Sequence, residues 1–179
     1  MKRLLFLVLF VACLPQSVFA QSSGQARLMT AAPTVDTNAY ATGDLVGGKL
    51  TFTNVLKPIT GSGYLVSVLM SDLSATAVDF DIVIFREDPT GTTFTDNAAF
   101  DIADADLPKV LAVVTLGSTS RFAFADNSIH YVGSLAIPVW GTNSSSGITG
   151  TLYVAIISRG APTFAAAGDV KITLGVSRD

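Results

Sequence analysis

Apolar and polar residues alternate along most of the chain beyond residue 43, with the period of β-strands that bury one face. Strands are predicted over residues 49–53, 64–70, 79–85, 109–116, 131–140, 151–158 and 169–176. The range 64–70 is almost entirely apolar, which is typical of a central strand buried on both faces. The last range is the most regular, and its inward side chains are Val170, Ile172, Leu174 and Val176.

Turn-forming residues separate these runs, for example at 47–48, 61–63, 88–91 and 142–147. The one helical candidate covers residues 101–107, ends at Pro108 and has Asp101 in position to cap its first turn. Seven to eight short strands without a long helix predict an all-β fold, an antiparallel two-sheet β-sandwich or jelly roll with one short helical turn. The order of the strands does not separate these two topologies.

The first 20 residues have the pattern of a secretory signal peptide. Lys2 and Arg3 precede an apolar run that is too short to span a bilayer, and Ala20 ends a small-residue cleavage site. Residues 10–13 also resemble a lipoprotein box, so lipid attachment at Cys13 is an alternative. We expect a leader at 1–20, an extended polar arm at 21–42 and a β-sandwich domain at 43–179. The protein is then exported (periplasmic, cell-surface or extracellular), without stable membrane insertion after leader cleavage.

The composition argues against nucleic-acid binding and against most catalytic chemistry. Charged residues make up 14% of the chain and the formal net charge is -3, so there is no basic patch for phosphates. Cys13 is the only cysteine, and His130, the only histidine, is expected to be partly exposed at a strand end without a nucleophile motif nearby. The one glutamate, Glu87, is adjacent to Asp88, and neighbours on a strand point apart, which makes a poor acid/base pair. We therefore expect a protein that is not an enzyme.

Four carboxylates lie close together in the sequence around the helical candidate. Ca²⁺ takes oxygen ligands, and closely spaced aspartates in a loop can supply them. The spacing differs from that of an EF-hand, and aspartates also cap helices and form turns without an ion. The candidate Ca²⁺ ligands are Asp96, Asp101, Asp104 and Asp106.

The aromatic residues offer a candidate carbohydrate-binding position. Trp140 is the only tryptophan and lies beside a serine-rich loop, where its ring could stack on a sugar or simply pack. Phe122 and Phe124 alternate in a short segment and are predicted to belong to the core.

Much of the chain from residue 40 onward resembles small virion structural proteins of tailed bacteriophages, which decorate the capsid. The resemblance is carried by residues 41–48 (ATGDLVGG), 94–107 (FTDNAAFDIADADL), 150–155 (GTLYVA) and 159–164 (RGAPTF). It implies a non-enzymatic all-β module that assembles on a particle surface, with protein partners through self-assembly or capsid docking.

The leader favours a second hypothesis, an exported bacterial cell-surface or matrix protein. Such a protein would be a fibre subunit, an adhesin or a carbohydrate-binding module. The arm at 21–42 would then add as a strand to the sheet edge of a neighbouring copy. In the carbohydrate-binding version, Trp140 would contact the sugar.

Overall fold

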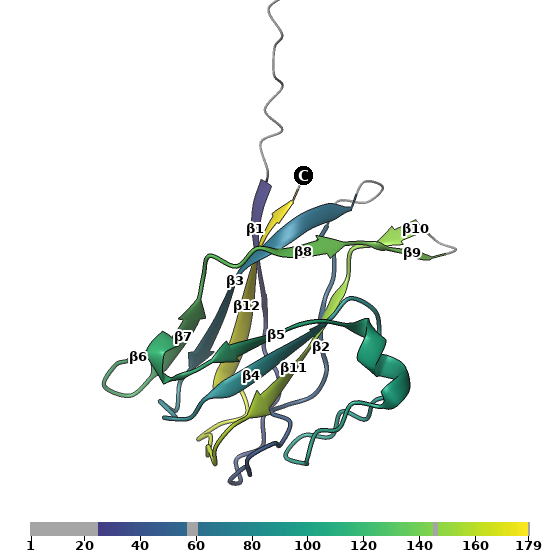
Figure 1. Ribbon diagram of the computed structural model, residues 1–179. Coiled ribbons are helices and arrows are strands. Elements are labelled where there is room, and N and C mark those ends of the chain that lie inside the picture. Colours follow the sequence, from purple (N-terminus) through teal and green to yellow (C-terminus); the bar gives the residue numbers. More distant parts are fainter. Residues whose placement is uncertain (1–24, 57–60, 145–146, 179) are drawn as a thin grey trace, which may run out of the picture.

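The computed structural model describes residues 25–56, 61–144 and 147–178 (Figure 1). The leader predicted at 1–20, including Cys13, lies outside the described residues. Within the described part of the chain, no helix is long and apolar enough to cross a membrane.

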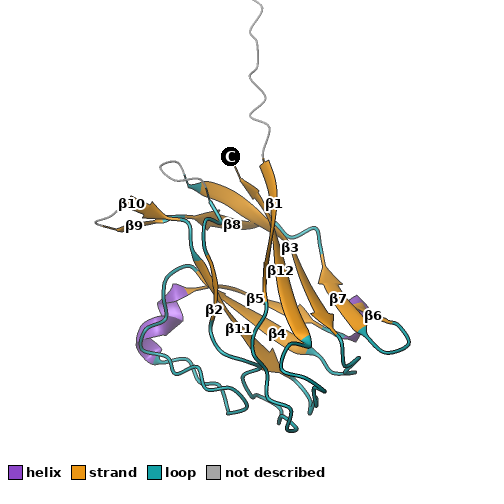
Figure 2. Cartoon of the chain, turned by 180° about the vertical axis from the view of Figure 1, so that it is seen from behind, coloured by secondary structure: helices purple, strands orange, loops and turns teal. Residues whose placement is uncertain are grey.

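Six strands form one antiparallel sheet, seen from behind in Figure 2. The order is β1 (Gln25–Ala31), β12 (Val170–Arg178), β3 (Ser62–Asp72), β7 (Ser128–Val132) and β6 (Arg121–Ala123), and β8 (Ile137–Trp140) also pairs with β3. Four strands form the second antiparallel sheet, in the order β2 (Leu50–Phe52), β11 (Leu152–Ser158), β4 (Phe80–Phe85) and β5 (Val110–Leu116). A small hairpin joins β9 (Thr142–Ser144) to β10 (Gly147–Thr149). The predicted all-β sandwich is confirmed.

The main core lies between the two sheets. The predicted alternation of β12 is confirmed, because Val170, Ile172, Leu174 and Val176 are all fully buried. They pack with the inward residues of the facing sheet, among them Ile82, Ile84, Val154 and Ile156. Each fully buried side chain of this kind stabilises the fold by roughly 1.5–3 kcal/mol.

Two strand predictions need correction. The range 64–70 lies in β3, which is buried on one face only, since its residues alternate and Tyr64 is exposed. The range 131–140 forms two separate strands, β7 and β8, which pair with different parts of β3. Asp169 begins the predicted strand 169–176, where alternation places it on the outward side, but it is buried and accepts hydrogen bonds from the Ser74 hydroxyl and the Ala166 amide.

The segment predicted as an extended arm is integrated into the sandwich over its described part. β1 pairs along its whole length with β12 of the same chain. Val35 and Tyr40, which follow β1, are buried in the main core. The arm therefore completes the chain's own sheet in this structure.

The helical prediction is wrong in its bounds and its cap. The structure has a 3₁₀ helix, η1, over Asp104–Lys109, with Pro108 inside it and no side-chain cap. Asp101 lies exposed before the helix starts. A short 3₁₀ helix tolerates Pro108 because few of its amides have partners within the helix. A second 3₁₀ turn, η2, covers Ser118–Ser120.

The segment between β4 and β5 covers the outer face of the four-stranded sheet, and Figure 1 shows it beside β11 and β2. Phe94, Phe100 and Ile102 from this segment pack on a second buried cluster around Phe85 and Ile157. The chain therefore protects one of its two outer sheet faces with its own loop.

Candidate functional site

The outer face of the six-stranded sheet carries large apolar side chains that nothing among the described residues covers. Each is between 47% and 75% exposed. They come from β1, β3, β6, β7 and β8 and from the turn after β6: Leu28, Tyr64, Phe122, Phe124, Tyr131 and Trp140. We call this surface the open face.

The strand register places five of these residues on one side of the sheet, and Phe124 follows in the turn after β6. Leu28 lies opposite Gly175, Tyr131 opposite Leu69, and Phe122 opposite Ile129. At the other end of the sheet Tyr64 lies opposite Pro138, and Trp140 follows two residues later on β8. Alternate residues of the same strands point into the core, so the open face runs across the whole sheet.

The open face is closely packed at its surface. A Cβ atom on Gly175 would lie 2.2 Å from the Ser67 hydroxyl oxygen and 3.4 Å from a Leu28 methyl carbon, so these side chains lie over the glycine. A Cβ atom on Gly133 would lie 2.4 Å from the Tyr131 hydroxyl oxygen, so the Tyr131 side chain lies along the backbone of residue 133. The absence of a Cβ atom at these two glycines leaves room for the Ser67, Leu28 and Tyr131 side chains beside the backbone.

The open face is also nearly free of charge. Among the outward-facing positions of the described strands of this sheet, only Lys171 is charged, and it lies opposite Ser71. The hydroxyls of Thr30 and Thr173 hydrogen-bond each other at 2.8 Å across β1 and β12. Two of the polar groups on the face are thus already paired, which reduces the cost of removing them from water.

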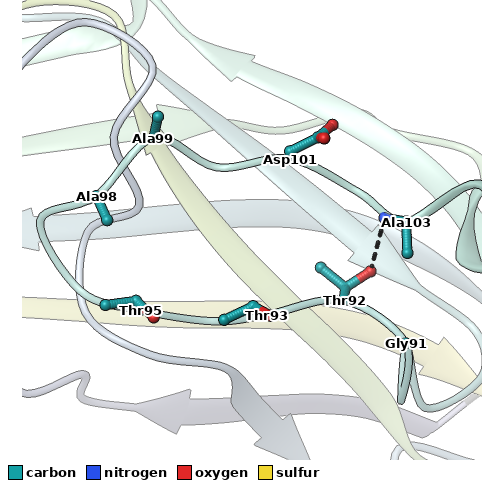
Figure 3. Close-up of a pocket in the computed structure, with 8 residues that line it drawn as sticks. All are labelled: Gly91, Thr92, Thr93, Thr95, Ala98, Ala99, Asp101 and Ala103. Carbon is teal, nitrogen blue, oxygen red and sulfur yellow. Dashed lines mark hydrogen bonds between the residues drawn. The ribbon is translucent and has the colours of Figure 1, made fainter.

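A cavity of about 320 Å³ lies in the loop that follows β4 (Figure 3). Its lining is small and polar: Gly91, Thr92, Thr93, Thr95, Ala98, Ala99, Asp101 and Ala103. The Thr92 hydroxyl accepts a hydrogen bond from the Ala103 amide at 3.2 Å and so joins its two walls. The cavity offers hydroxyls, backbone groups and the carboxylate of Asp101.

The four predicted Ca²⁺ ligands are not brought together. Asp96 accepts hydrogen bonds from the Tyr40 hydroxyl (2.7 Å) and the Gly47 amide (2.6 Å). Asp101 lines the cavity, and Asp104 is exposed in η1. Within the ranges 25–56, 61–144 and 147–178, no three His, Cys, Asp or Glu side chains are grouped as a metal site requires. Ca²⁺ binding here stays a prediction.

Asp106 does not point to a common ion site but links η1 to the start of the loop that lines the cavity. Its side chain is buried, and it accepts hydrogen bonds from the Gly91 amide and the Thr92 hydroxyl, both at 2.8 Å. Lys109 lies 2.7 Å from its other oxygen. The bond to Lys109 is the largest cause that lowers the pKa of Asp106, and Thr92 lowers it further.

Lys49 fixes the far side of the same loop. Its Nζ atom lies 2.5 Å from Asp88 Oδ1 and within 6 Å (5.7 and 5.4 Å) of the ring centroids of Phe94 and Tyr153. Glu87 pairs with Arg86 instead, at 3.6 Å. The two adjacent carboxylates therefore belong to different ion pairs.

His130 lies in the core, so the prediction of a partly exposed histidine is wrong. β7 turns His130 inward, where its ring packs edge-on against Phe80 with a centroid distance of 5.7 Å. Neither ring nitrogen makes a well-aligned hydrogen bond to a described residue. Burial lowers the pKa of His130 below its usual 6.5 and Arg121 lowers it further, while Asp72, Asp79 and the Leu116 backbone oppose this shift.

Phe122 and Phe124 are exposed, so their assignment to the core is wrong. Trp140, the predicted carbohydrate-binding residue, is about half exposed on the open face. Sequence reasoning missed the open face as a unit, although the apolar residues on both sides of β3 were a signal for it.

No protein-family model matches the chain, and a search of the curated proteins finds no match to it. The function is therefore inferred from the geometry of the chain itself.

Proposed function

We propose that this is a non-enzymatic structural protein that works by assembly, with the open face as its docking surface. Its role would be that of the small proteins that decorate phage capsids, which it resembles in sequence. The observation that carries the proposal is the open face, which presents six exposed large apolar side chains and a single charge at its strand positions, with Asp126 exposed in the turn beside Phe124.

The size of the open face supports docking. A packed aromatic side chain buries roughly 150–250 Å², so five partly exposed rings and Leu28 leave about 500 Å² of apolar area there. The largest apolar patch on a typical monomer is about 300–600 Å² and is often functional. With the intervening Ser, Thr, Gly and Pro residues, the face approaches the roughly 800 Å² that each partner contributes to a stable interface.

One sheet has its outer face covered by the chain and the other does not, and this difference supports the same proposal. The four-stranded sheet is covered by the chain's own loop, which packs Phe94 and Phe100 onto it. The six-stranded sheet has apolar residues at equivalent outward positions but no such cover among the described residues. Apolar area of this extent is normally buried in a folded protein, and a partner would bury it.

The test is to fractionate the source by density gradient and to quantify the full-length polypeptide in each fraction by mass spectrometry. We expect wild-type protein with large particles or surface assemblies, and Leu28→Lys and Phe122→Lys variants mainly in the soluble fraction. Val113→Lys is the matched control, because Val113 is 55% exposed on β5 of the other sheet. Wild-type protein found only as a small soluble species would overturn the proposal, as would full retention of both variants.

A second candidate function is carbohydrate binding in an exported cell-surface or matrix protein. It is favoured by Trp140, which is half exposed and two residues from the Pro138 that faces Tyr64. Aromatic rings of this kind can stack on the apolar face of a sugar. Loss of glycan-array binding in Trp140→Ala, with binding kept in Val113→Lys, would support the carbohydrate-binding function. Equal array signals for Trp140→Ala and wild type would exclude it.

A further inference from the structure

We infer that the occupant of the open face is a second copy of this chain, packed sheet against sheet in a two-fold dimer. The inference rests on the proposed function, because both require the open face to be an interface. It goes further by naming the partner and the geometry. Four features of the face favour a second copy over a different protein or a charged surface.

The first feature is the charge pattern. The chain carries a net charge of -3, but only Lys171 contributes a charge at the outward strand positions of the open face. In a two-fold interface the same patch is present on both sides, so any cluster of like charges would face itself. A nearly neutral face avoids this repulsion, and it offers little to a partner that binds through charge.

The second feature is the shape. The outward residues lie on one extended antiparallel sheet, and the Tyr131 and Leu28 side chains lie beside glycine positions. A sheet of this kind packs well against another sheet about 10 Å away, as in the sandwich itself. The partner that certainly offers a matching sheet face is another copy.

The third feature is the state of the polar groups between the apolar residues. The hydroxyls of Thr30 and Thr173 bond each other across two strands of the face. Dry contact with another apolar face would therefore leave both of these hydroxyls satisfied. A hydrated partner surface would gain little from them.

The fourth feature is the area. About 500 Å² of apolar side chain on each copy gives about 1,000 Å² when two faces meet, before the small residues are added. Adding the small residues brings the total near the 1,200–2,000 Å² of stable interfaces. The area of the face is therefore sufficient for a dimer.

The experiment uses the purified full chain, measured by sedimentation velocity over a range of concentrations. Trp140 provides a second readout, since it is the only tryptophan and lies on the open face. We expect a dimer that dissociates on dilution, with a red shift of the tryptophan emission at the same midpoint. Leu28→Lys and Phe122→Lys should weaken the dimer at least tenfold, Val113→Lys should leave it unchanged, and thermal melts should show that all three fold.

Three results would overturn the inference. One is a monomer at every concentration, and another is a dimer whose dissociation leaves the Trp140 emission unchanged. The third is a dimer that Leu28→Lys and Phe122→Lys do not weaken. If the chain is monomeric but both variants are lost from the particle fraction, the dimer is excluded and the proposed docking function stands. If the chain is dimeric but both variants remain in the particle fraction, docking uses another surface. The proposed function then fails while the dimer stands.

Discussion

The hydroxyl of Tyr40 donates a hydrogen bond of 2.7 Å to the carboxylate of Asp96, and so joins the segment after β1 to the loop that covers the four-stranded sheet. The same hydroxyl accepts a bond from the Asp36 amide, and Asp96 also accepts one from Gly47. Burial and the bond to Asp96 raise the pKa of Tyr40, so its proton stays in place.

The Tyr40 bond should therefore contribute to stability. In Tyr40→Phe the ring still packs on Phe164, but the partly buried Asp96 carboxylate and the Asp36 amide each lose a hydrogen-bond partner. We expect a loss of about 1–3 kcal/mol in the free energy of unfolding, measured by urea denaturation. Tyr64→Phe is the control, because the Tyr64 ring is half exposed on the open face. Equal losses in the two variants would contradict this role for Tyr40.

Asp106 should be the main polar support of the cavity loop. In Asp106→Asn the ion pair with Lys109 is lost, and the Gly91 amide and Thr92 hydroxyl keep a weaker acceptor. We expect a melting temperature lower by several degrees, on the order of 3–6 °C, and faster amide hydrogen exchange in residues 91–103. Asp104→Asn should change neither quantity, because Asp104 is exposed. If Asp104→Asn had the larger effect, the assignment of Asp106 would be wrong.

The buried His130 should make the fold sensitive to mild acid. Its pKa is lowered in the folded state from the usual 6.5, so the unfolded chain binds the proton more readily. This contribution to stability is complete above pH 6.5 and is lost as the pH falls through the lower folded pKa. Denaturation at pH 7.5 and 5.5 should show a drop for wild type and a smaller drop for His130→Phe. Carboxylates with lowered pKa values, such as Asp106 and Asp169, change their charge below about pH 4, so they do not contribute to a stability difference between pH 7.5 and 5.5.

A wild-type protein with the same stability at pH 7.5 and 5.5 would contradict the account of His130. An equal drop in His130→Phe would assign the effect to another group. His130→Phe is suitable because the site is lined by Phe80 and accepts an aromatic ring without a proton to gain. Its own stability at pH 7.5 shows whether the new ring fits.

The strands could be predicted from the sequence because alternation depends only on neighbouring residues. In β12 four inward residues alternate with polar ones, and all four are buried. Alternation fixes which residues share a face, but it does not show whether that face is covered. Phe122 and Phe124 alternate in the sequence and were expected in the core, but both are exposed.

The error at β3 has the same cause. Apolar residues on both sides of residues 64–70 indicated a strand buried on both faces, whereas Tyr64 and Leu69 belong to the open face. Apolar residues on both sides of a strand indicate either burial on both faces or one apolar face that is exposed, and the second explanation applies to β3.

Loop contacts between distant segments could not be predicted from local patterns. Asp44 forms a bridge with Ala99, and the Leu45 amide donates a hydrogen bond to the carbonyl of Ala98. These contacts bring residues 41–48 and 94–107 side by side, two of the stretches on which the hypothesis of a phage decoration protein rests. The aspartates between residues 96 and 106 suggested an ion, but Asp96 and Asp106 accept hydrogen bonds from amides or hydroxyls of the chain itself.

The most direct test of the central claim, that the open face is the docking surface, is hydroxyl-radical footprinting with mass spectrometry. The free chain at high dilution is compared with the chain in its assembled state. The account predicts that labelling of Tyr64, Phe122, Tyr131 and Trp140 falls severalfold on assembly, while labelling of Leu107, exposed in η1, stays the same. Unchanged labelling of the four aromatic residues, with protection elsewhere on the chain, would contradict it.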